Sequence, residues 1–411
     1  MNAGRATAAT EHGPAVEQAL AWIEGLAGDI GPRRPTGVAE QVAATWVRER
    51  LTRAGLTTEE LRFDGLDTFA RSRGIPVAVA VAAGLLPRGR VRHAGAAAAL
   101  LAGALEDDLR LVPIERVLAR SPSRCVIGVV EPRDEATRTL CLVSHLDSSR
   151  SGLLFHPALA PHLRRLIATI SVALAIQAAE PLLARAAAGR TAVAAARGVL
   201  TVALALLAER ELRGEDVPGA NDNASGVAVA AATATAVAAE PLSSTRLVFL
   251  ATGCEESGTT GMRAFLESRD TTGWLFLNLD GVGAPATLRY LPREGVGRVW
   301  RADPALLAVA ERIARERPEL GLQPAERLVG LIYDATQVLV RGGRALTISA
   351  QDATIPNYHT PSDTPENVDA DVVARALEVT MELVAAVDRG EADSPGADAS
   401  RPPAAVAGAA D

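Results

Sequence analysis

Two histidines and a set of carboxylates stand in short polar motifs that follow apolar runs of the sequence. They are His145 and Asp147 in "SHLDS", Asp222 in "GANDNASGVA", Glu255 and Glu256 in "GCEESG", Asp280 in "NLDG" and His359 in "NYHTPSD". Imidazole nitrogen and carboxylate oxygen are ligands that zinc takes in proteins. Because buried carboxylates are costly without a counter-charge, a pair of divalent cations would remove that cost. The residue types therefore predict a site for two cations.

Asp222 is the single acid in its polar turn. Asn223 follows it directly, and Gly226 lies three residues further on. Asparagine and glycine let a turn adopt demanding backbone angles. The helix expected to begin near Ala224 brings its positive end close to the carboxylate. One carboxylate between two cations can bind both, so Asp222 is the candidate bridge.

Each motif alone also has a structural interpretation. An H-x-D pattern occurs by chance, a Glu-Glu pair after a strand often starts a helix, and "NDNASG" is typical of an N-capping turn. Asp280 could cap a loop. The order of all the motifs along one chain favours the metal site. The remaining histidines show no such pattern, and we expect them at surface or hairpin positions; they are His12, His93, His156 and His162.

Strand-like and helix-like segments alternate along the chain, which predicts an α/β domain with a largely parallel sheet. Strand patterns lie at 59–63, 123–131, 137–147, 245–256 and 273–281, and helix patterns at 15–28, 36–54, 224–239, 259–268, 304–317 and 368–388. Ligands of such sheets gather at the carboxyl ends of the strands. The last three strand patterns end in the acids or the histidine named above, so these side chains should meet at one sheet edge.

Two apolar stretches do not fit this alternation. Residues 75–105 and 164–209 each hold two apolar runs joined by an arginine-bearing turn, which predicts two helical hairpins. Runs of about 12 residues are too short to cross a bilayer, which takes roughly 20. The second pair is longer but is interrupted by Glu180, Pro181 and Arg197. Two interpretations stay open: a side bundle or homo-oligomer interface, and hairpins embedded in or lying on a membrane.

The expected organisation is one domain over 15–390, with hairpin inserts at about 70–110 and 160–210. A flexible arm over 1–14 precedes it, and a disordered tail over 391–411 follows. The net charge is −7, all 42 basic residues are arginine, and no basic stripe is present, which makes nucleic acid an unexpected partner. The amino terminus lacks the pattern of a secretion signal. We therefore expect a protein that is cytoplasmic or associated with the cytoplasmic membrane.

The three cysteines are an odd number at irregular spacings, so a disulfide framework or a cysteine zinc site is not expected.

The motif order resembles that of the co-catalytic di-zinc aminopeptidases, the family of bacterial leucyl aminopeptidase, with glutaminyl cyclase as a relative. The resemblance extends to "IGPRRPTGVAEQVAATWVRERLTRAGL" and "HTPSDTPENVD". It does not cover residues 64–122 and 155–212, although similar hydrophobic inserts occur in a membrane-associated branch of the family.

The resemblance implies a zinc-exopeptidase (phosphorylase/hydrolase-like) fold, in which helices sandwich a mixed, mostly parallel sheet with two Zn²⁺ ions at its edge. It assigns ligands residue by residue. One zinc takes His145 and Asp280, the other takes Glu256 and His359, and Asp222 bridges them. The peptide bond that follows Asp222 is cis in relatives, and the same is expected here.

Three further roles follow from the resemblance. Asp147 would orient the imidazole of His145, and Asp363 would do the same for His359. Glu255 would be the general base that takes a proton from a zinc-activated water and passes it to the leaving amine. The implied reaction is the hydrolytic removal of the amino-terminal residue from a peptide substrate.

The chain departs from the family pattern at one loop. Many relatives carry Ser-Asp-His before the last strand, whereas "IYDATQVLVRGG" holds Asp334 and no histidine, which leaves substrate specificity open. Hairpins that cover the cleft would restrict substrates to small peptides. Two other functions remain: a glutaminyl-cyclase-like acyltransferase, which uses one zinc and usually has tryptophan where this chain has Tyr358, and a membrane-linked or scaffold protein with an inactive peptidase fold.

Overall fold

The computed structural model describes residues 12–118, 120–327 and 331–393. Its main sheet has eight strands in the order β1-β2-β4-β3-β5-β10-β6-β9. These are β1 (Thr57–Gly65), β2 (Ser121–Val130), β3 (Arg138–His145), β4 (Thr245–Thr252), β5 (Leu275–Leu279), β6 (Leu288–Tyr290), β9 (Gln323–Pro324) and β10 (Arg344–Ala350), while β7 (Arg293–Glu294) and β8 (Trp300–Arg301) form a separate pair. The central strands β4, β3, β5 and β10 pair in parallel, and β1, β2 and β6 are joined antiparallel. The expected mixed sheet is confirmed.

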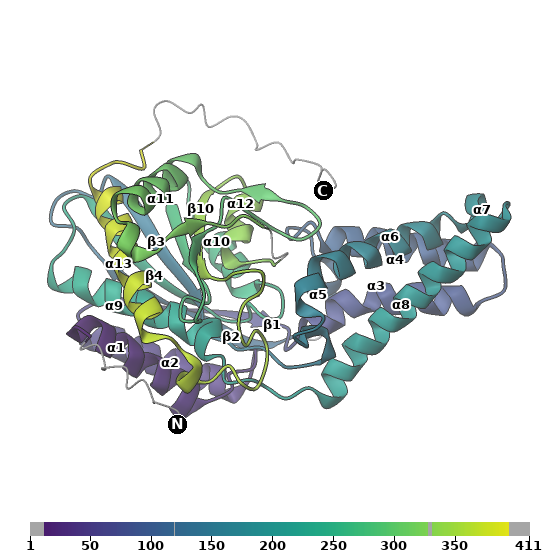
Figure 1. The fold of residues 1–411 in the computed structure, drawn as a ribbon, viewed down its shortest axis with the longest axis horizontal. Coiled ribbons are helices and arrows are strands. Elements are labelled where there is room, and N and C mark those ends of the chain that lie inside the picture. The colour runs from purple at the N-terminus through teal and green to yellow at the C-terminus, as the bar shows by residue number, and fades with distance from the viewer. Residues whose placement is uncertain (1–11, 119, 328–330, 394–411) are drawn as a thin grey trace, which may run out of the picture.

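Helices lie on both faces of this sheet (Figure 1). They are α1 (Pro14–Ile23), α2 (Val38–Arg53), α9 (Gly226–Ala239), α11 (Pro304–Glu316) and α13 (Ala370–Asp388) on one face, and α10 (Thr260–Ser268) and α12 (Asp334–Val340) on the other. Strand β3 shows the cause, because Leu140 and Leu142 pack in the first layer while Cys141 and Val143 pack in the second. A strand that is apolar on both sides requires cover on both faces.

The two inserts form one helical bundle beside the α/β part (Figure 1). Its helices are α3 (Phe69–Leu85), α4 (Arg90–Glu106), α6 (Leu163–Ala178), α7 (Glu180–Leu183) and α8 (Ala187–Arg213), and a short α5 (Pro113–Val117) follows the first hairpin. Small side chains dominate the bundle core, in which Ala80, Ala99, Ala196 and Ala203 surround Leu200. Both predicted hairpins are therefore present as helices, and they pack against each other.

A buried ion cluster explains how charged residues interrupt the apolar runs of the bundle. The carboxylate of Glu180 accepts two hydrogen bonds from the Arg92 guanidinium, at 2.8 and 2.9 Å, and one from Arg197 at 2.8 Å. The side chains of Glu180 and Arg92 are 3% and 8% exposed. Because a buried charge is tolerated when it is paired and hydrogen-bonded, these residues can join the helices instead of breaking them.

Helix α8 is also long and apolar enough to cross a membrane, by its length and composition, and 22% of its most apolar window is buried inside the protein. Its buried face belongs to the bundle core, whereas Val202 is 58% exposed. Exposed apolar residues also occur on the other hairpin, for example Val91 and Leu101. The bundle thus buries one side of each helix and presents apolar side chains on the other.

The ordered chain extends past the boundary expected at residue 390. Ala392 is 1% exposed, and its carbonyl accepts a hydrogen bond from Arg344. The carboxylate of Asp393 pairs with Arg138. The tail prediction is therefore wrong for residues 391–393, because these contacts anchor them to the sheet. The predictions for 1–11 and 394–411 fall outside the described residues.

The packing of the bundle core predicts the cost of truncating Leu200. Its side chain is fully buried, so Leu200→Ala should lower the free energy of unfolding of the bundle by about 2–5 kcal/mol. Val202→Ala, two residues away on the exposed side of α8, should cost much less. Urea denaturation followed by circular dichroism measures both changes. Equal losses in the two variants would contradict the bundle packing.

Candidate metal centre

Adjacent parallel strands bring the candidate ligands to one edge of the sheet. Strand β3 ends at His145, β4 is followed by Glu255 and Glu256, and β5 is followed by Asp280. Strand β3 pairs in parallel with β4 on one side and β5 on the other, so the three carboxyl ends are neighbours. The loop before α9 supplies Asp222. The predicted meeting of these side chains at one sheet edge is what the structure shows.

Asp222 lies between the two histidines. Its Oδ1 is 3.1 Å from the Nε2 of His145, and its Oδ2 is 3.2 Å from the Nε2 of His359. The Nε2 of His359 is also 3.1 Å from Oε1 of Glu256, and that of His145 is 3.7 Å from Oδ2 of Asp280. Two donors bound to one tetrahedral zinc at about 2.0–2.1 Å lie roughly 3.3 Å apart. The spacing therefore fits two adjacent metal positions that share the Asp222 carboxylate.

The donor atoms fall into overlapping groups whose members all lie within 4.8 Å of one another. One group holds His145, Asp222 and Asp280, and another holds Asp222, Glu256 and His359. A third joins His145 to Glu255 and Glu256. Oε1 of Glu256 is buried and has no hydrogen-bond partner among the described residues, which leaves it free to bind a cation. Both ligand sets implied by the family resemblance are thus assembled.

Buried negative charge gives this edge its electrostatic character. Burial raises the pKa of Asp280 to about 8, and that of Glu255 well above its usual range. Burial has the opposite effect on the pKa of an imidazole. Burial alone would lower the pKa of His359, but Glu256 and Asp222 raise it to about 9. For Asp222, burial is outweighed by the two histidines, which hold its pKa well below the usual range. The donor set favours positive charge, as a site for divalent cations must.

The polar turn around Asp222 holds the loop that carries Asp280. The side-chain amide of Asn223 donates to the carbonyl of Leu279 at 2.9 Å, and its oxygen accepts from the amide of Gly281 at 3.1 Å. These two contacts bracket Asp280. Gly226 permits the close approach, because a Cβ there would lie 2.2 Å from the Leu279 carbonyl oxygen. The peptide bond between Asp222 and Asn223 is cis, as the resemblance implied.

Asp363 contacts a different partner from the one expected. Its carboxylate accepts hydrogen bonds from the backbone amides of Asn221 and Asp222, at 2.7 and 3.0 Å. The expectation that it orients His359 is therefore wrong, because the chain folds back so that Asp363 faces the Asp222 turn. The Nδ1 of His359 is buried without a hydrogen-bond partner in the described part of the chain. The ring is held instead by aromatic contacts.

Asp147 also acts through the backbone. The Nδ1 of His145 lies 3.0 Å from the carbonyl oxygen of Asp147, whereas the carboxylate oxygen is 3.8 Å away. The carbonyl thus fixes the imidazole, and it favours the tautomer that leaves Nε2 available to a metal. The Asp147 carboxylate accepts from the amides of Glu255 and Glu256, at 3.1 and 2.9 Å. It therefore orders the glutamate pair, which corrects the expected contact between the carboxylate and the imidazole.

Several residues that support the site were not recognised in the sequence. Arg33 is fully buried and donates to the carbonyls of Leu146 and Gly219, at 2.7 and 2.9 Å. It thereby joins the end of β3 to the start of the Asp222 turn. Glu40 accepts from the amide of Cys254 at 3.0 Å, just before the glutamate pair. An arginine in a loop and a glutamate in the first turn of a helix are ordinarily exposed, so nothing in the sequence marked them.

Aromatic rings cover His359. The ring of Tyr358 stacks on it with a centroid separation of 3.7 Å, and that of Phe155 meets it edge-on at 4.3 Å. Phe155 lies in the helical turn Leu153–Phe155, just before the second hairpin. The inserted segment therefore reaches the centre itself. Nothing in the sequence indicates this contact, because Phe155 and His359 are 204 positions apart in the chain and meet only in the folded structure.

The loop that departs from the family pattern also lies close to the centre. Asp334 is fully buried, and its Oδ2 accepts a hydrogen bond from Thr252, the last residue of β4. Its other oxygen has no partner among the described residues. Glu294 braces the same loop, since it accepts from Thr336 and Thr347 at 2.7 Å each. This acid joins α12 to β10.

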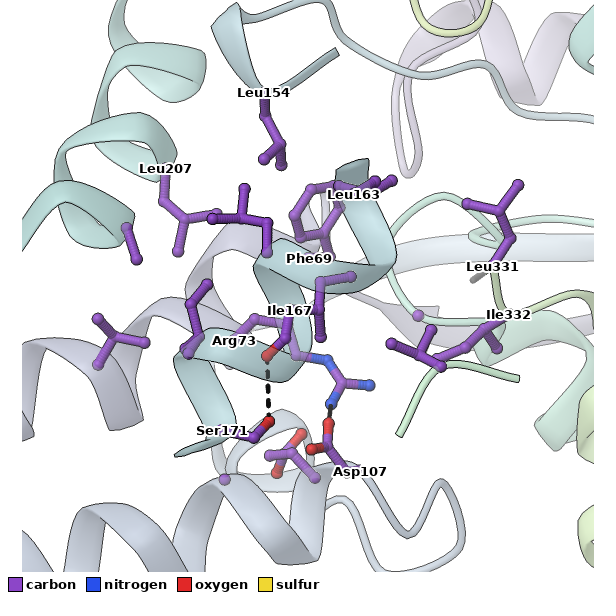
Figure 2. Close-up of a pocket in the computed structure, with 18 of the residues that line it drawn as sticks. Phe69, Arg73, Asp107, Leu154, Leu163, Ile167, Ser171, Leu207, Leu331 and Ile332 are labelled. Atoms are coloured by element: carbon purple, nitrogen blue, oxygen red, sulfur yellow. Dashed lines mark hydrogen bonds and ion pairs between the residues drawn. The ribbon is translucent and has the colours of Figure 1, made fainter. Parts of the chain in front are cut away.

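A cavity of about 280 Å³, part of whose lining is drawn in Figure 2, adjoins the candidate centre. Glu255, Glu256 and His359 belong to its wall. Most of the remaining wall comes from the base of the bundle, including Phe69 and Ile167. The inserts thus shape the space in which a substrate would lie.

Comparison with known proteins agrees with this geometry. Residues 202–384 match the model of Peptidase family M28. The family resemblance is confirmed. This match supports a metal-dependent peptidase, and it spans the candidate ligands from Asp222 to His359, whereas His145 lies before it. A search of curated proteins finds no match.

Solved structures share the fold. A zinc aminopeptidase from Bacillus subtilis has a TM-score of 0.54 at 17% identity, with 90% of this chain and 94% of that chain covered. An aminopeptidase from Aneurinibacillus sp. strain AM-1 has a TM-score of 0.54 at 15% identity, with 96% of each chain covered. A glutaminyl cyclase from Porphyromonas gingivalis has a TM-score of 0.55 at 15% identity, covering 90% and 97%.

Asn223 provides a test of how the Asp222 turn supports metal binding. Asn223→Ala removes the contacts that bracket Asp280, so we expect zinc affinity to fall about 10–100-fold. A competition titration against a chromophoric chelator measures this. Asn367→Ala is the matched control. Asn367 is exposed, and its side-chain amide donates hydrogen bonds to the carbonyl of Ser362 and the hydroxyl of Thr364 in a surface loop. Unchanged zinc affinity in Asn223→Ala would show that the Asn223 side chain does not support metal binding.

The buried carboxyl of Glu294 should make the free energy of unfolding depend on pH. Burial raises its pKa from 4.5 to about 7. Between these values the folded chain binds more protons here than the unfolded chain, so stability falls as the pH rises through this window. Glu294→Gln should remove that loss and be more stable at pH 8 by on the order of 3 kcal/mol. The two proteins should differ little below pH 4.5.

Urea denaturation of both proteins at several pH values between 4.5 and 8 tests this expectation. Pairing them at each pH cancels the effects that other groups share. Parallel pH profiles for the wild type and the variant would show that Glu294 is not the titrating group.

Proposed function

We propose that this protein is a di-zinc aminopeptidase that hydrolyses the amino-terminal peptide bond of its substrate. One observation carries the proposal: the two oxygens of Asp222 lie 3.1 and 3.2 Å from the Nε2 atoms of His145 and His359. A carboxylate placed symmetrically between two imidazoles suits a bridge between two cations. Glu256 and Asp280 complete one ligand set each.

The bound ions would supply a Lewis acid for the scissile carbonyl and an acidified water. The chain supplies the proton carrier. Oε2 of Glu255 lies 4.0 Å from the Nε2 of His145, and the residue lines the cavity. Burial first, and then the neighbouring acids Asp334 and Glu256, raise its pKa well above the usual range against the opposing effect of His145. Such a carboxyl can accept a proton from the attacking water and deliver it to the leaving amine.

The backbone divides the two glutamates between these tasks. Asp147 holds both of their amides, which fixes the turn so that adjacent side chains point to different targets. Glu256 meets His359 at 3.1 Å, in the second ligand set. Glu255 stays at the cavity wall. This arrangement supports metal binding by Glu256 and proton transfer by Glu255.

A second function is glutaminyl cyclisation, which is favoured by the likeness of the fold to a Porphyromonas gingivalis glutaminyl cyclase. The two complete ligand sets around Asp222 favour the peptidase instead. Activity assays with two kinds of substrate, combined with the zinc content, distinguish the two functions. Release of the first residue from aminoacyl fluorogenic substrates with two zinc ions bound supports the peptidase, and cyclisation of an amino-terminal glutamine with one zinc bound supports the cyclase. Bound metal without turnover of either substrate supports an inactive peptidase fold.

The proposal extends to location. We place the protein in the cytoplasm or on the cytoplasmic membrane, with the bundle as the part that meets lipid or a second copy of the chain. The length and apolar character of α8 support this, as do exposed side chains such as Val91 and Leu101. Sedimentation with and without detergent, and flotation with liposomes, separate the two contacts. A protein that stays monomeric and does not bind liposomes would exclude both the lipid contact and the contact with a second copy.

Paired substitutions test the division of roles. Glu255→Gln should keep both zinc ions and lower kcat by about 10²–10⁴-fold, because the side chain keeps its shape but loses its basicity. Glu256→Gln should lose metal occupancy. Zinc content by atomic absorption and turnover of an aminoacyl fluorogenic substrate give the two readouts. Equal zinc loss in the two variants would refute the assignment.

A further inference from the structure

The cavity beside the centre is built largely by the inserts. Helix α6 contributes Leu163, Ile167 and Leu174 to its wall, α3 contributes Phe69, and α8 contributes Leu207. Figure 2 shows Leu163, Ile167, Phe69 and Leu207 around the space, with Leu331 and Ile332 of the α/β part on another side. The cavity therefore continues from the glutamate pair into the base of the bundle.

The cavity is long compared with one amino-acid side chain. Its wall follows α6 from Leu163 to Leu174, a distance of about 16 Å at the rise of an α-helix. That length equals roughly five residues of extended chain. Its volume of about 280 Å³ is nearly twice that of a roughly 150 Å³ cavity that accommodates benzene. A leucine or phenylalanine side chain would leave much of it unfilled.

The part of the wall that the bundle supplies offers little to a peptide backbone. Helical segments satisfy their own amide and carbonyl groups, and the side chains named above are apolar. Polar side chains that the bundle adds to the wall already have partners within the protein. Arg73 pairs with Asp107 at 2.5 Å, and Ser171 donates to the carbonyl of Ile167 at 3.2 Å (Figure 2). A peptide in this space would leave its own amides unpaired, whereas an aliphatic chain has none to satisfy.

We propose that this cavity holds an unbranched aliphatic chain, and that the preferred substrate is an amide that carries such a chain next to the scissile bond. The inference rests on the proposed hydrolase function and specifies its substrate class. Water adds to the amide carbon as the carbon–nitrogen bond breaks. The acyl part leaves as a carboxylic acid, and the nitrogen takes a proton and leaves as an amine. The aliphatic chain can be part of either the acid or the amine.

Two homologous series test the proposal on the zinc-loaded enzyme. N-acyl-alanines of 2 to 14 acyl carbons carry the chain on the acid, and alanine N-alkylamides of the same lengths carry it on the amine. In one series kcat/KM should rise about fourfold for each added methylene until the cavity is full. The series that rises identifies the side that carries the chain. A flat profile in both series, with turnover of the short members, would overturn the proposal.

A matched pair of variants on α6 locates the effect. Ile167 lines the cavity, and Ile167→Arg places a charge in it, so the dependence on chain length should disappear. Val172 lies on the same helix, is 56% exposed and is not part of the wall, so Val172→Arg should retain the dependence. Circular dichroism confirms that both variants fold. Loss of the length dependence in both variants, or in neither, would contradict the assigned cavity.

Binding separates this inference from the proposed function. Calorimetry on zinc-loaded Glu255→Gln, the variant expected to keep its metals and to lose most turnover, measures the affinity for N-decanoyl-alanine, N-acetyl-alanine and the decyl- and ethylamides of alanine. A longer chain should bind at least 100-fold more tightly than its short counterpart in one of the two pairs. If no substrate is hydrolysed but this difference is present, the peptidase proposal fails and the chain-binding cavity stands. Equal affinities within both pairs would overturn the cavity proposal, whatever the activity.

Discussion

The structure depends on the need to neutralise carboxylates that are gathered at one buried sheet edge. Asp222 is placed between two imidazoles, and its pKa is low because both histidines stabilise its charge. Asp280 and Glu255 lie nearby with raised pKa values, because they are buried among other acids. Such a cluster is costly on its own, and the pair of divalent cations that we propose would turn the repulsion into binding. The supporting hydrogen bonds maintain this concentration of charge.

Those hydrogen bonds act mainly on the backbone. Arg33 joins the end of β3 to the Asp222 turn, Asn223 brackets the Asp280 loop, and Asp147 holds the two glutamate amides. Glu40 fixes the residue before the glutamate pair. Because these buried side chains bond to the backbone of the segments that carry the candidate ligands, they fix the strand ends and turns from which those ligands extend. This preorganisation suits a centre whose donors must meet within a few ångströms.

The inserts shape the cavity beside the candidate metal centre. Phe155 covers His359, and the helices beyond it enclose an apolar space that begins at Glu255. The α/β part therefore holds the candidate metal ligands, while the bundle contributes most of the apolar wall of the adjoining cavity. The ion cluster of Glu180 with Arg92 holds the helices together away from the centre. The candidate metal ligands and most of the apolar wall thus come from separate parts of the chain that share one cavity.

The sequence by itself determined the alternation of strands and helices, the two hairpins and the candidate ligands, because periodicity and residue type act locally. It also pointed to Asp222 as the shared ligand. Only the tertiary structure decided which atoms meet. Asp363 faces the Asp222 turn instead of His359, and the carbonyl of Asp147 takes the place expected for its carboxylate. The joining of two hairpins into a cavity wall likewise arises from contacts between distant segments. Sequence spacing cannot encode such contacts, because they depend on how the chain folds back on itself.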